Sequence, residues 1–222
     1  MKKLVASLLA AIGMSSMPQA AEKIENVDIN KIRYTMPTVA ADQIEYGVPT
    51  KESFQGAPQF HEDEWAQLEF FPGSRLPEIQ KLLKEYKLFE KANRTKNGWL
   101  KIYSRQITRE QITPITISPM VISNETSSQL LPAPILVTAS KPLGQVKDGF
   151  SLLLGTNAYL YGQVNSKGIS VLGAYLAGAD DMMLSRAFAT LNKKHGLILV
   201  DWRQQFILIS VAENGEFNVW QP

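Results

Sequence analysis

The residues that could do chemistry are few, and their spacing does not define a reaction. Ser185, His195 and Asp201 have the side-chain types of a nucleophile, a base and an orienting acid. Such a triad is defined by geometry in the fold, and no Gly-x-Ser-x-Gly turn supports it here. His195 follows Lys193 and Lys194 at a predicted helix end, where positive charge is favourable for the helix dipole. We therefore expect His195 to serve as a helix-end residue.

Acidic residues offer a second kind of chemistry. Asp180 and Asp181 are neighbours at a predicted helix start, and residues 61–64 read His-Glu-Asp-Glu. A glycosidase needs two carboxyl groups facing each other across a cleft, which adjacent residues rarely do. Consecutive residues also point in different directions, which is poor spacing for metal ligands. We expect helix capping and solvation for these groups, no metal, no cofactor and no assigned catalytic residue.

Aromatic residues at strand ends are the remaining candidates. Trp202 ends one predicted strand and Arg203 follows it, and Phe217 and Trp220 begin and end the last strand. Trp and Arg are enriched among the residues that dominate binding at protein interfaces. Most large aromatic side chains lie in cores, which is the alternative for each of these rings. The sequence therefore predicts a partner-binding site at Trp202, Arg203, Phe217 and Trp220.

The N-terminus has the layout of an export signal. Lys2 and Lys3 provide a positive start, residues 4–12 form an apolar run, and small and polar residues follow. The apolar run is too short to be a permanent membrane anchor. We expect residues 1–20 to be a signal peptide that is removed on export. The expected compartment is the periplasm, with full secretion as the alternative.

Charge and cysteine content further narrow the class of protein and the partners it could bind. The chain has 23 Lys and Arg and 21 Asp and Glu, so loss of Lys2 and Lys3 leaves 21 of each and a net charge of zero. Nucleic-acid binding normally needs a basic excess, and we expect no nucleic-acid partner. The chain has no cysteine, which excludes disulfides and thiolate chemistry. No second apolar stretch is long enough to span a bilayer, so we expect no transmembrane segment in the mature chain.

The first half of the chain contains one clear structural unit. Residues 65–71 are aromatic-rich and favour a strand. A helix is predicted to begin after Ser74, with Pro77 in its first turn and apolar residues at helical spacing. Residues 99–105 favour a second strand. Pro114 and Pro119 then interrupt residues 106–142, which predicts edge strands or extended connections, with a surface loop at residues 123–128.

The second half is more regular. A helix is predicted from Asp180 or Asp181 to a C-terminal Gly196, with apolar residues at i, i+3, i+4 and i+7. Asn214-Gly215 predicts a two-residue type I′ turn with positive φ at both positions. The predicted strands of this half cover residues 150–154, 159–164, 169–176, 197–202, 206–211 and 217–220.

These elements predict an α+β fold. We expect a mainly antiparallel sheet with two principal helices packed on one face, preceded by the signal peptide and an irregular N-terminal arm. The expected organisation is a signal peptide at residues 1–20, an arm at 21–63 and an α+β domain at 64–222. Two lobes, 64–106 and 143–222, joined by the Pro-rich extended segment, are the alternative.

Two classes of function fit this reading. The first is a non-enzymatic exported protein that binds another envelope or secreted protein, as an assembly or accessory factor of a secretion, conjugation or envelope system, or as an immunity-type inhibitor. The alternative is a cell-wall hydrolase that uses Asp and Glu residues, or Ser185 and His195. Peptidoglycan is an alternative partner on architectural analogy alone. A concave pocket with convergent acids would favour the enzyme, and an unpaired sheet edge would favour the binder.

Overall fold

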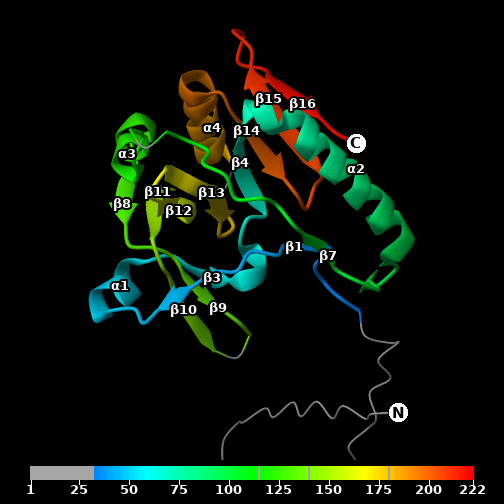
Figure 1. Ribbon diagram of the computed structural model, residues 1–222, viewed down its shortest axis with the longest axis horizontal. Helices are drawn as coiled ribbons and strands as arrows, with labels where there is room; N and C mark the ends of the chain where they lie inside the picture. Colours follow the sequence, from blue (N-terminus) through cyan, green and yellow to red (C-terminus); the bar gives the residue numbers. More distant parts are fainter. Residues whose placement is uncertain (1–32, 115, 140, 180) are drawn as a thin grey trace, which may run out of the picture. The chain divides into compact units, whose positions relative to one another are not determined.

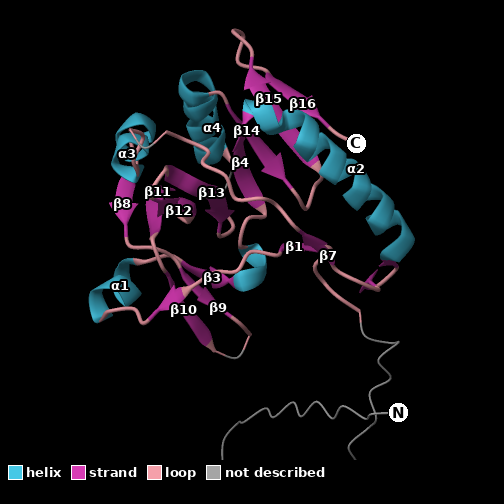
Figure 2. Ribbon diagram, viewed as in Figure 1, coloured by secondary structure: helices cyan, strands magenta, loops and turns pink. Residues whose placement is uncertain are grey.

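The computed structural model describes residues 33–222 except 115, 140 and 180. The predicted signal peptide (1–20), the first part of the predicted arm (21–32) and Asp180 therefore lie outside the described residues. The described chain is a mixed α/β structure with mostly antiparallel sheets (Figures 1 and 2). Its four α-helices are α1 (Lys51–Gly56), α2 (Leu76–Asn93), α3 (Pro119–Thr126) and α4 (Met182–His195). Within this part of the chain, no helix has the length and apolarity needed to cross a membrane.

The main sheet has eight strands, and every neighbouring pair in it is antiparallel. It combines strands from both predicted lobes, because a strand at residues 68–72 lies between two strands of the C-terminal half. In spatial order the strands are β16 (Phe217–Trp220), β15 (Phe206–Val211), β14 (Leu197–Asp201), β4 (Leu68–Pro72), β13 (Gly168–Leu176), β12 (Ala158–Asn165), β11 (Gly149–Gly155) and β8 (Gln129–Leu131).

Smaller sheets bind the described part of the predicted arm to the rest of the chain. A four-stranded sheet has the order β2 (Tyr46–Gly47), β10 (Pro142–Val146), β9 (Ile135–Val137) and β3 (Gln59–His61). A parallel pair joins β1 (Thr38–Ala40) to β7 (Tyr103–Arg105), and β5 (Arg94–Thr95) pairs with β6 (Gly98–Trp99). The predicted strand at 99–105 is thus two short strands outside the main sheet. Of these two strands, β7 pairs with β1 of the arm and β6 pairs with β5.

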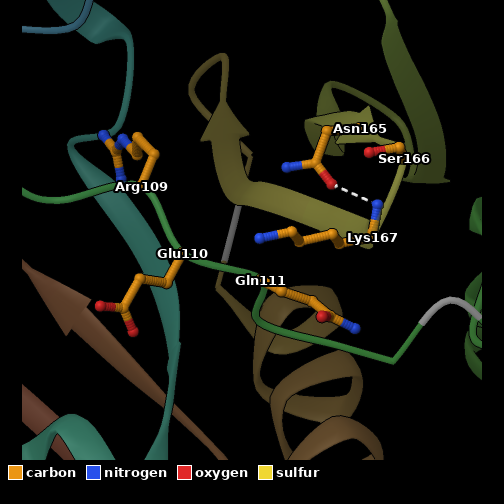
Figure 3. Close-up of a pocket in the computed structure, with 6 residues that line it drawn as sticks. All are labelled: Arg109, Glu110, Gln111, Asn165, Ser166 and Lys167. Carbon is orange, nitrogen blue, oxygen red and sulfur yellow. Dashed lines mark hydrogen bonds between the residues drawn. The ribbon is translucent and has the colours of Figure 1, made fainter.

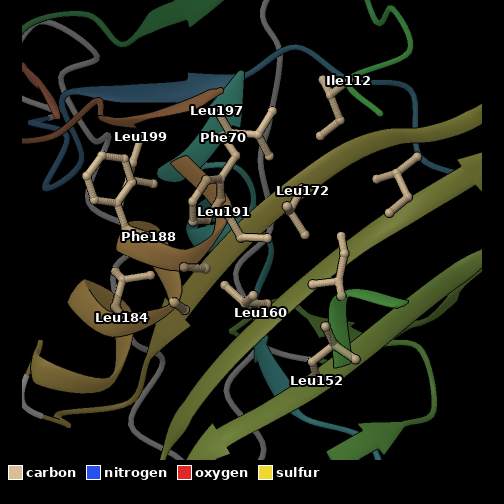
Figure 4. Packing of buried hydrophobic residues seen from close by; sticks show 14 of the residues in the cluster. Phe70, Ile112, Leu152, Leu160, Leu172, Leu184, Phe188, Leu191, Leu197 and Leu199 are labelled. Atoms are coloured by element: carbon tan, nitrogen blue, oxygen red, sulfur yellow. The ribbon is translucent and has the colours of Figure 1, made fainter. Parts of the chain in front are cut away.

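The two long helices lie on opposite faces of the main sheet. Along β4, Phe70 packs in the cluster that contains α4, whereas Phe71 packs in the cluster that contains α2. Side chains alternate between the faces of a strand, so the two clusters are on different faces. Figure 4 shows the α4 side, with Leu184 and Phe188 against the sheet. The prediction of both helices on one face is wrong, because β4 and β14 are apolar on both sides and both need cover.

The helix signals read from the sequence mark real helices. In α4, Leu184, Ala187, Phe188 and Leu191 are buried, as their spacing predicts. Gly196 ends this helix in the left-handed conformation and donates its N–H to the carbonyl of residue 192, which confirms the predicted stop. The helix predicted after residue 74 is α2, and it has proline in its first turn.

Two helices were not predicted: α1 lies within the stretch predicted to be an irregular arm, and α3 lies in the Pro-rich segment. Helix α3 occupies residues for which the sequence favoured strand at Val121 and Ile122 and loop at 123–128. The Ser118 side chain accepts a hydrogen bond from the Val121 N–H, and Pro119 occupies the first turn, so the chain has a regular helix start there. Proline at position 119 predicts an interrupted strand, but in the structure Pro119 is the first residue of helix α3.

The three predicted C-terminal strands are present and pair in sequence order, although β15 is mostly only half-buried and the last turn differs from the prediction. Strand β14 is buried and inside the sheet, and β16 is the edge strand. In the loop between β15 and β16, Gly215 alone has positive φ (85°), so the predicted type I′ turn is wrong. The Gly215 N–H bonds to the Ala212 carbonyl and the Ala212 N–H to the Glu216 carbonyl. This is a type I turn followed by a left-handed glycine, which allows a three-residue loop.

Candidate functional site

The structure divides the four predicted partner-binding residues into two groups. Trp202 has no exposed surface; its ring meets Phe71 edge to face and lies 5.0 Å from the Arg105 guanidinium carbon. Arg203 is partly buried, and its Nη2 lies 2.7 Å from a carboxylate oxygen of Glu64. Trp202 is therefore a core residue, and Arg203 belongs to an ion pair beside a cleft described below.

Phe217 and Trp220 lie on the edge strand β16. Phe217 is 39% exposed and its ring is 5.9 Å from that of Phe188 on α4. Trp220 is partly buried on the α2 face, with the ammonium of Lys84 5.8 Å from its ring. Between them, Val219 is 47% exposed. Of the two predicted residues at this edge, Phe217 is therefore accessible on the α4 face together with Val219, whereas Trp220 packs on the α2 face.

Ser185 and His195 do not form a catalytic pair. Both lie on α4, ten residues apart, which corresponds to about 15 Å along a helix. His195 Nε2 instead lies 2.7 Å from a carboxylate oxygen of Glu125 on α3, and Lys194 approaches the same carboxylate at 3.3 Å. His195 is thus a helix-end residue, as expected, and it also joins α4 to α3.

The Glu125 contacts lead to a prediction about pH. Burial raises the pKa of Glu125, but hydrogen bonds from His195 and Lys194 outweigh it and lower the pKa below its usual value. A carboxyl whose pKa is lower in the folded state stabilises the fold above its unfolded pKa, and this contribution is lost as the pH falls. Glu125→Gln should therefore reduce the free energy of unfolding at pH 7 and have progressively less effect toward pH 3, about one unit or more below the unfolded Glu value. Urea denaturation at a series of pH values tests this, and a difference that grows on acidification would contradict it.

A cleft opens where strand β4 begins. Strands β13 and β14 are both antiparallel to β4 and pair with it on either side. β4 starts at Leu68, because Ala66 has a positive φ (54°) and turns the preceding chain out of the sheet. The Tyr161 hydroxyl accepts the Ala66 N–H at 2.7 Å and holds this bend. The Tyr161 ring fits there because residue 173 is a glycine. A Cβ atom at position 173 would lie only 2.7 Å from the Tyr161 ring.

The cleft consists of two adjoining hollows of about 390 and 250 Å³. They share Leu68, Leu176, Asp201 and Gln204, so they are parts of one depression under the N-terminal half of α4. The larger hollow is also lined by Asp181, Leu184, Ser185, Leu199, Phe206 and Leu208, and the smaller by Glu64, Gln67, Ala174, Tyr175 and Arg203.

Asp201 is the buried acidic residue of this cleft. It is opposite Leu68 and Phe206 in the two strand pairs, among apolar side chains. Its Oδ1 accepts the Gln204 N–H at 2.8 Å, which closes the turn after β14. Burial raises the pKa of Asp201, and the backbone hydrogen bonds from Gln204 and Arg203 oppose that rise in part. A buried carboxyl with a raised pKa in a cleft is a candidate binding group.

A buried ion network on the α2 face was missed by sequence reasoning. Arg109 forms ion pairs with Glu69 on β4 and with Asp42, and its Nε lies 2.9 Å from Asp42 Oδ1. Arg105 is also buried, and it donates to the Thr38 hydroxyl at 2.7 Å. The network therefore fastens the chain before β2 and the chain after β7 to the main sheet. Arginine and acid residues far apart in sequence carry no local signal of such pairing.

A polar surface hollow lies beside this network (Figure 3). It is open, with a volume of about 440 Å³, and Arg109, Glu110 and Gln111 line one side. The turn between β12 and β13 lines the other, where the Lys167 N–H donates to Asn165 Oδ1 at 2.8 Å. This hydrogen bond lies within the β12–β13 turn, so the turn itself accounts for these polar groups of Asn165 and Lys167.

The acidic run at residues 61–64 is a short 3-10 turn. It comprises Glu62–Glu64, and His61 Nδ1 accepts the Asp63 N–H at 3.2 Å and so caps it. Across residues 33–222, apart from the three gaps, no three His, Asp or Glu side chains are grouped to hold a metal ion.

Comparison with known proteins adds no family to this geometry. The chain matches no protein-family model, no curated protein and no solved structure.

Proposed function

We propose that this chain is an exported, non-enzymatic protein that binds another envelope or secreted protein, as an accessory factor, an assembly factor or an immunity-type inhibitor. Export to the periplasm rests on the residue pattern of positions 1–20. The observation that supports the binding role is the edge strand β16. In this proposal, a strand of the partner pairs with β16 and extends the main sheet.

The composition of β16 suits strand addition. Edge strands are normally protected by charged residues, proline or very short length. Strand β16 reads Phe-Asn-Val-Trp, with no charge and no proline in its four residues. Phe217 and Val219 lie on the α4 face, since their partners Val211 and Leu208 pack against that cluster. Backbone pairing would supply affinity, and these two side chains would supply specificity.

The opposite edge of the sheet is less suitable. Strand β8 has only three residues, and α3 packs beside it. Leu130 is its one strongly exposed large apolar side chain in the described structure. We therefore assign the partner to β16.

A charge placed on the edge strand tests the proposal. Val219→Lys should reduce partner capture by roughly tenfold or more, because an added strand would have to cover a desolvated ammonium group. Val219 is nearly half exposed, so the fold should persist. The measurement is quantitative co-purification of the main bound protein from periplasmic extract after cross-linking.

The matched control is Glu213→Lys in the loop before β16. Glu213 is exposed, so this variant also gains a lysine near the edge without blocking the strand. It should capture the partner as the unmodified protein does. Equal capture by Val219→Lys and Glu213→Lys would overturn the assignment to β16.

A cell-wall hydrolase is the second candidate. Its support is the raised pKa of Asp201 in a cleft that Asp181 also lines, since hydrolysis of glycosidic bonds uses one carboxyl of raised pKa and a second carboxyl. Release of soluble fragments from peptidoglycan, lost on Asp201→Asn, would favour the hydrolase over the binding protein.

A further inference from the structure

We propose that the cleft below β4 binds an organic cation, namely an ammonium or guanidinium group carried on an apolar stem. The same chemistry is found in free amines and in Lys or Arg side chains of a protein. This site is separate from the β16 edge and does not depend on the proposed function.

The walls of the cleft are suited to the apolar stem. Leu176, Leu199 and Phe206 present aliphatic and aromatic surface from three strands, and Leu184 covers them from α4. The volume of the larger hollow, about 390 Å³, is in the range of small-molecule pockets. Such pockets are mostly apolar, with a few polar groups that fix the orientation of the ligand.

The polar groups are suited to a cation rather than an anion. Three carboxylates, of Asp181, Asp201 and Glu64, line the two hollows, against one cation, Arg203. Arg203 already faces Glu64 at 2.7 Å, which neutralises that pair. The remaining charge of the cleft is negative, and Asp201 carries it at the apolar end. An ammonium group there would form an ion pair with the Asp201 carboxylate, which is shielded from water.

The turn after β14 uses Asp201 as an acceptor of backbone hydrogen bonds from Gln204 and Arg203, but this role requires no negative charge. Closing that turn uses Oδ1, which accepts the Gln204 N–H. An asparagine could accept the same hydrogen bond through its own side-chain oxygen while carrying no charge. Asp201→Asn therefore separates the structural role of the residue from its proposed role in binding.

The test uses phenethylammonium as the probe, with phenethyl alcohol and phenylpropionate as its neutral and anionic counterparts. Titration of the ¹⁵N-labelled protein should give saturable amide shifts at Gln204 and Ser185 with the ammonium probe, at a Kd on the order of 1 mM. The alcohol should bind roughly tenfold more weakly, and the carboxylate should give no saturable shift. The same titration with a short peptide that has one central lysine tests whether the bound ammonium group comes from a protein side chain. Tighter binding of the peptide than of phenethylammonium would indicate a side chain, and weaker binding would indicate a free amine.

Two variants and one control complete the test. Asp201→Asn should weaken phenethylammonium binding by roughly tenfold, with the amide spectrum otherwise preserved. Ser185→Leu should fill the larger hollow and weaken binding of every probe while leaving Asp201 intact. Glu213→Gln removes one exposed carboxylate elsewhere and should change nothing. Equal binding of the ammonium and the alcohol, or no saturable shift at either amide, would overturn the proposal.

Discussion

Replacing Arg109 with methionine should lower the free energy of unfolding by about 3–5 kcal/mol, the usual effect of removing one partner from a buried ion pair. Glu69 is 1% exposed, and one of its carboxylate oxygens has no hydrogen-bond partner in the described structure. Arg109 is the cation paired with the other oxygen and with Asp42. Methionine has a similar stem but leaves Glu69 in the core without that cation.

The pH dependence of this variant has a definite sign. Burial raises the pKa of Glu69, and the charge of Arg109 opposes the rise. Without Arg109 the folded-state pKa should increase further. A group whose pKa is higher in the folded state contributes stability below its unfolded pKa, and that contribution is lost as the pH rises. The deficit of Arg109→Met should therefore be smallest in acid and grow toward neutral pH.

Urea denaturation followed by tryptophan fluorescence measures both effects. Glu69→Gln combined with Arg109→Met removes the buried charge and should recover part of the lost stability, without the pH dependence. Lys147→Met breaks the exposed pair of Lys147 with Glu45 and should have little effect, since such pairs contribute little. An Arg109→Met protein that matches Lys147→Met in stability would show that the network does not hold the arm.

Local patterns predicted the elements whose residues interact with their sequence neighbours. The helical spacing of α4 and its terminal Gly196 were readable because capping and amphipathicity are local. The strands predicted at residues 159–164 and 169–176 are present as β12 and β13, which are adjacent in sequence and pair with each other. The type of the β15–β16 loop was not readable, because Asn214-Gly215 fits both a two-residue turn and a three-residue loop that ends in glycine.

Long-range features could not be predicted in this way. The opposite placement of α2 and α4 depends on β4 lying between β13 and β14, and no local pattern specifies that order. The cleft depends on the same order and on the bend at Ala66, which Tyr161 holds from β12. The sequence showed Asp201 as a possible orienting acid for His195; its burial and its actual neighbours follow from the strand order of the sheet.

Trp202 and Phe217 should respond differently to truncation, although sequence reasoning placed both in one partner site. Trp202→Ala should lower the free energy of unfolding by about 3–5 kcal/mol, because the whole indole ring is buried against Phe71 and Arg105. Phe217→Ala should change it by less than about 1 kcal/mol, because the ring is at the rim. When equal amounts of folded protein are compared, Phe217→Ala should reduce capture of the partner more than Trp202→Ala does.

The conservative variant Trp202→Phe provides that control. The indole nitrogen of Trp202 has no hydrogen-bond partner in the described structure, so phenylalanine gives up no hydrogen bond and keeps most of the ring. The variant should remain folded and capture the partner normally, whereas Phe217→Ala should remain folded and capture less. A stable Trp202→Ala protein that fails to bind would instead place Trp202 in the interface. That result would require β14 to open on binding, because its strand is buried within the sheet.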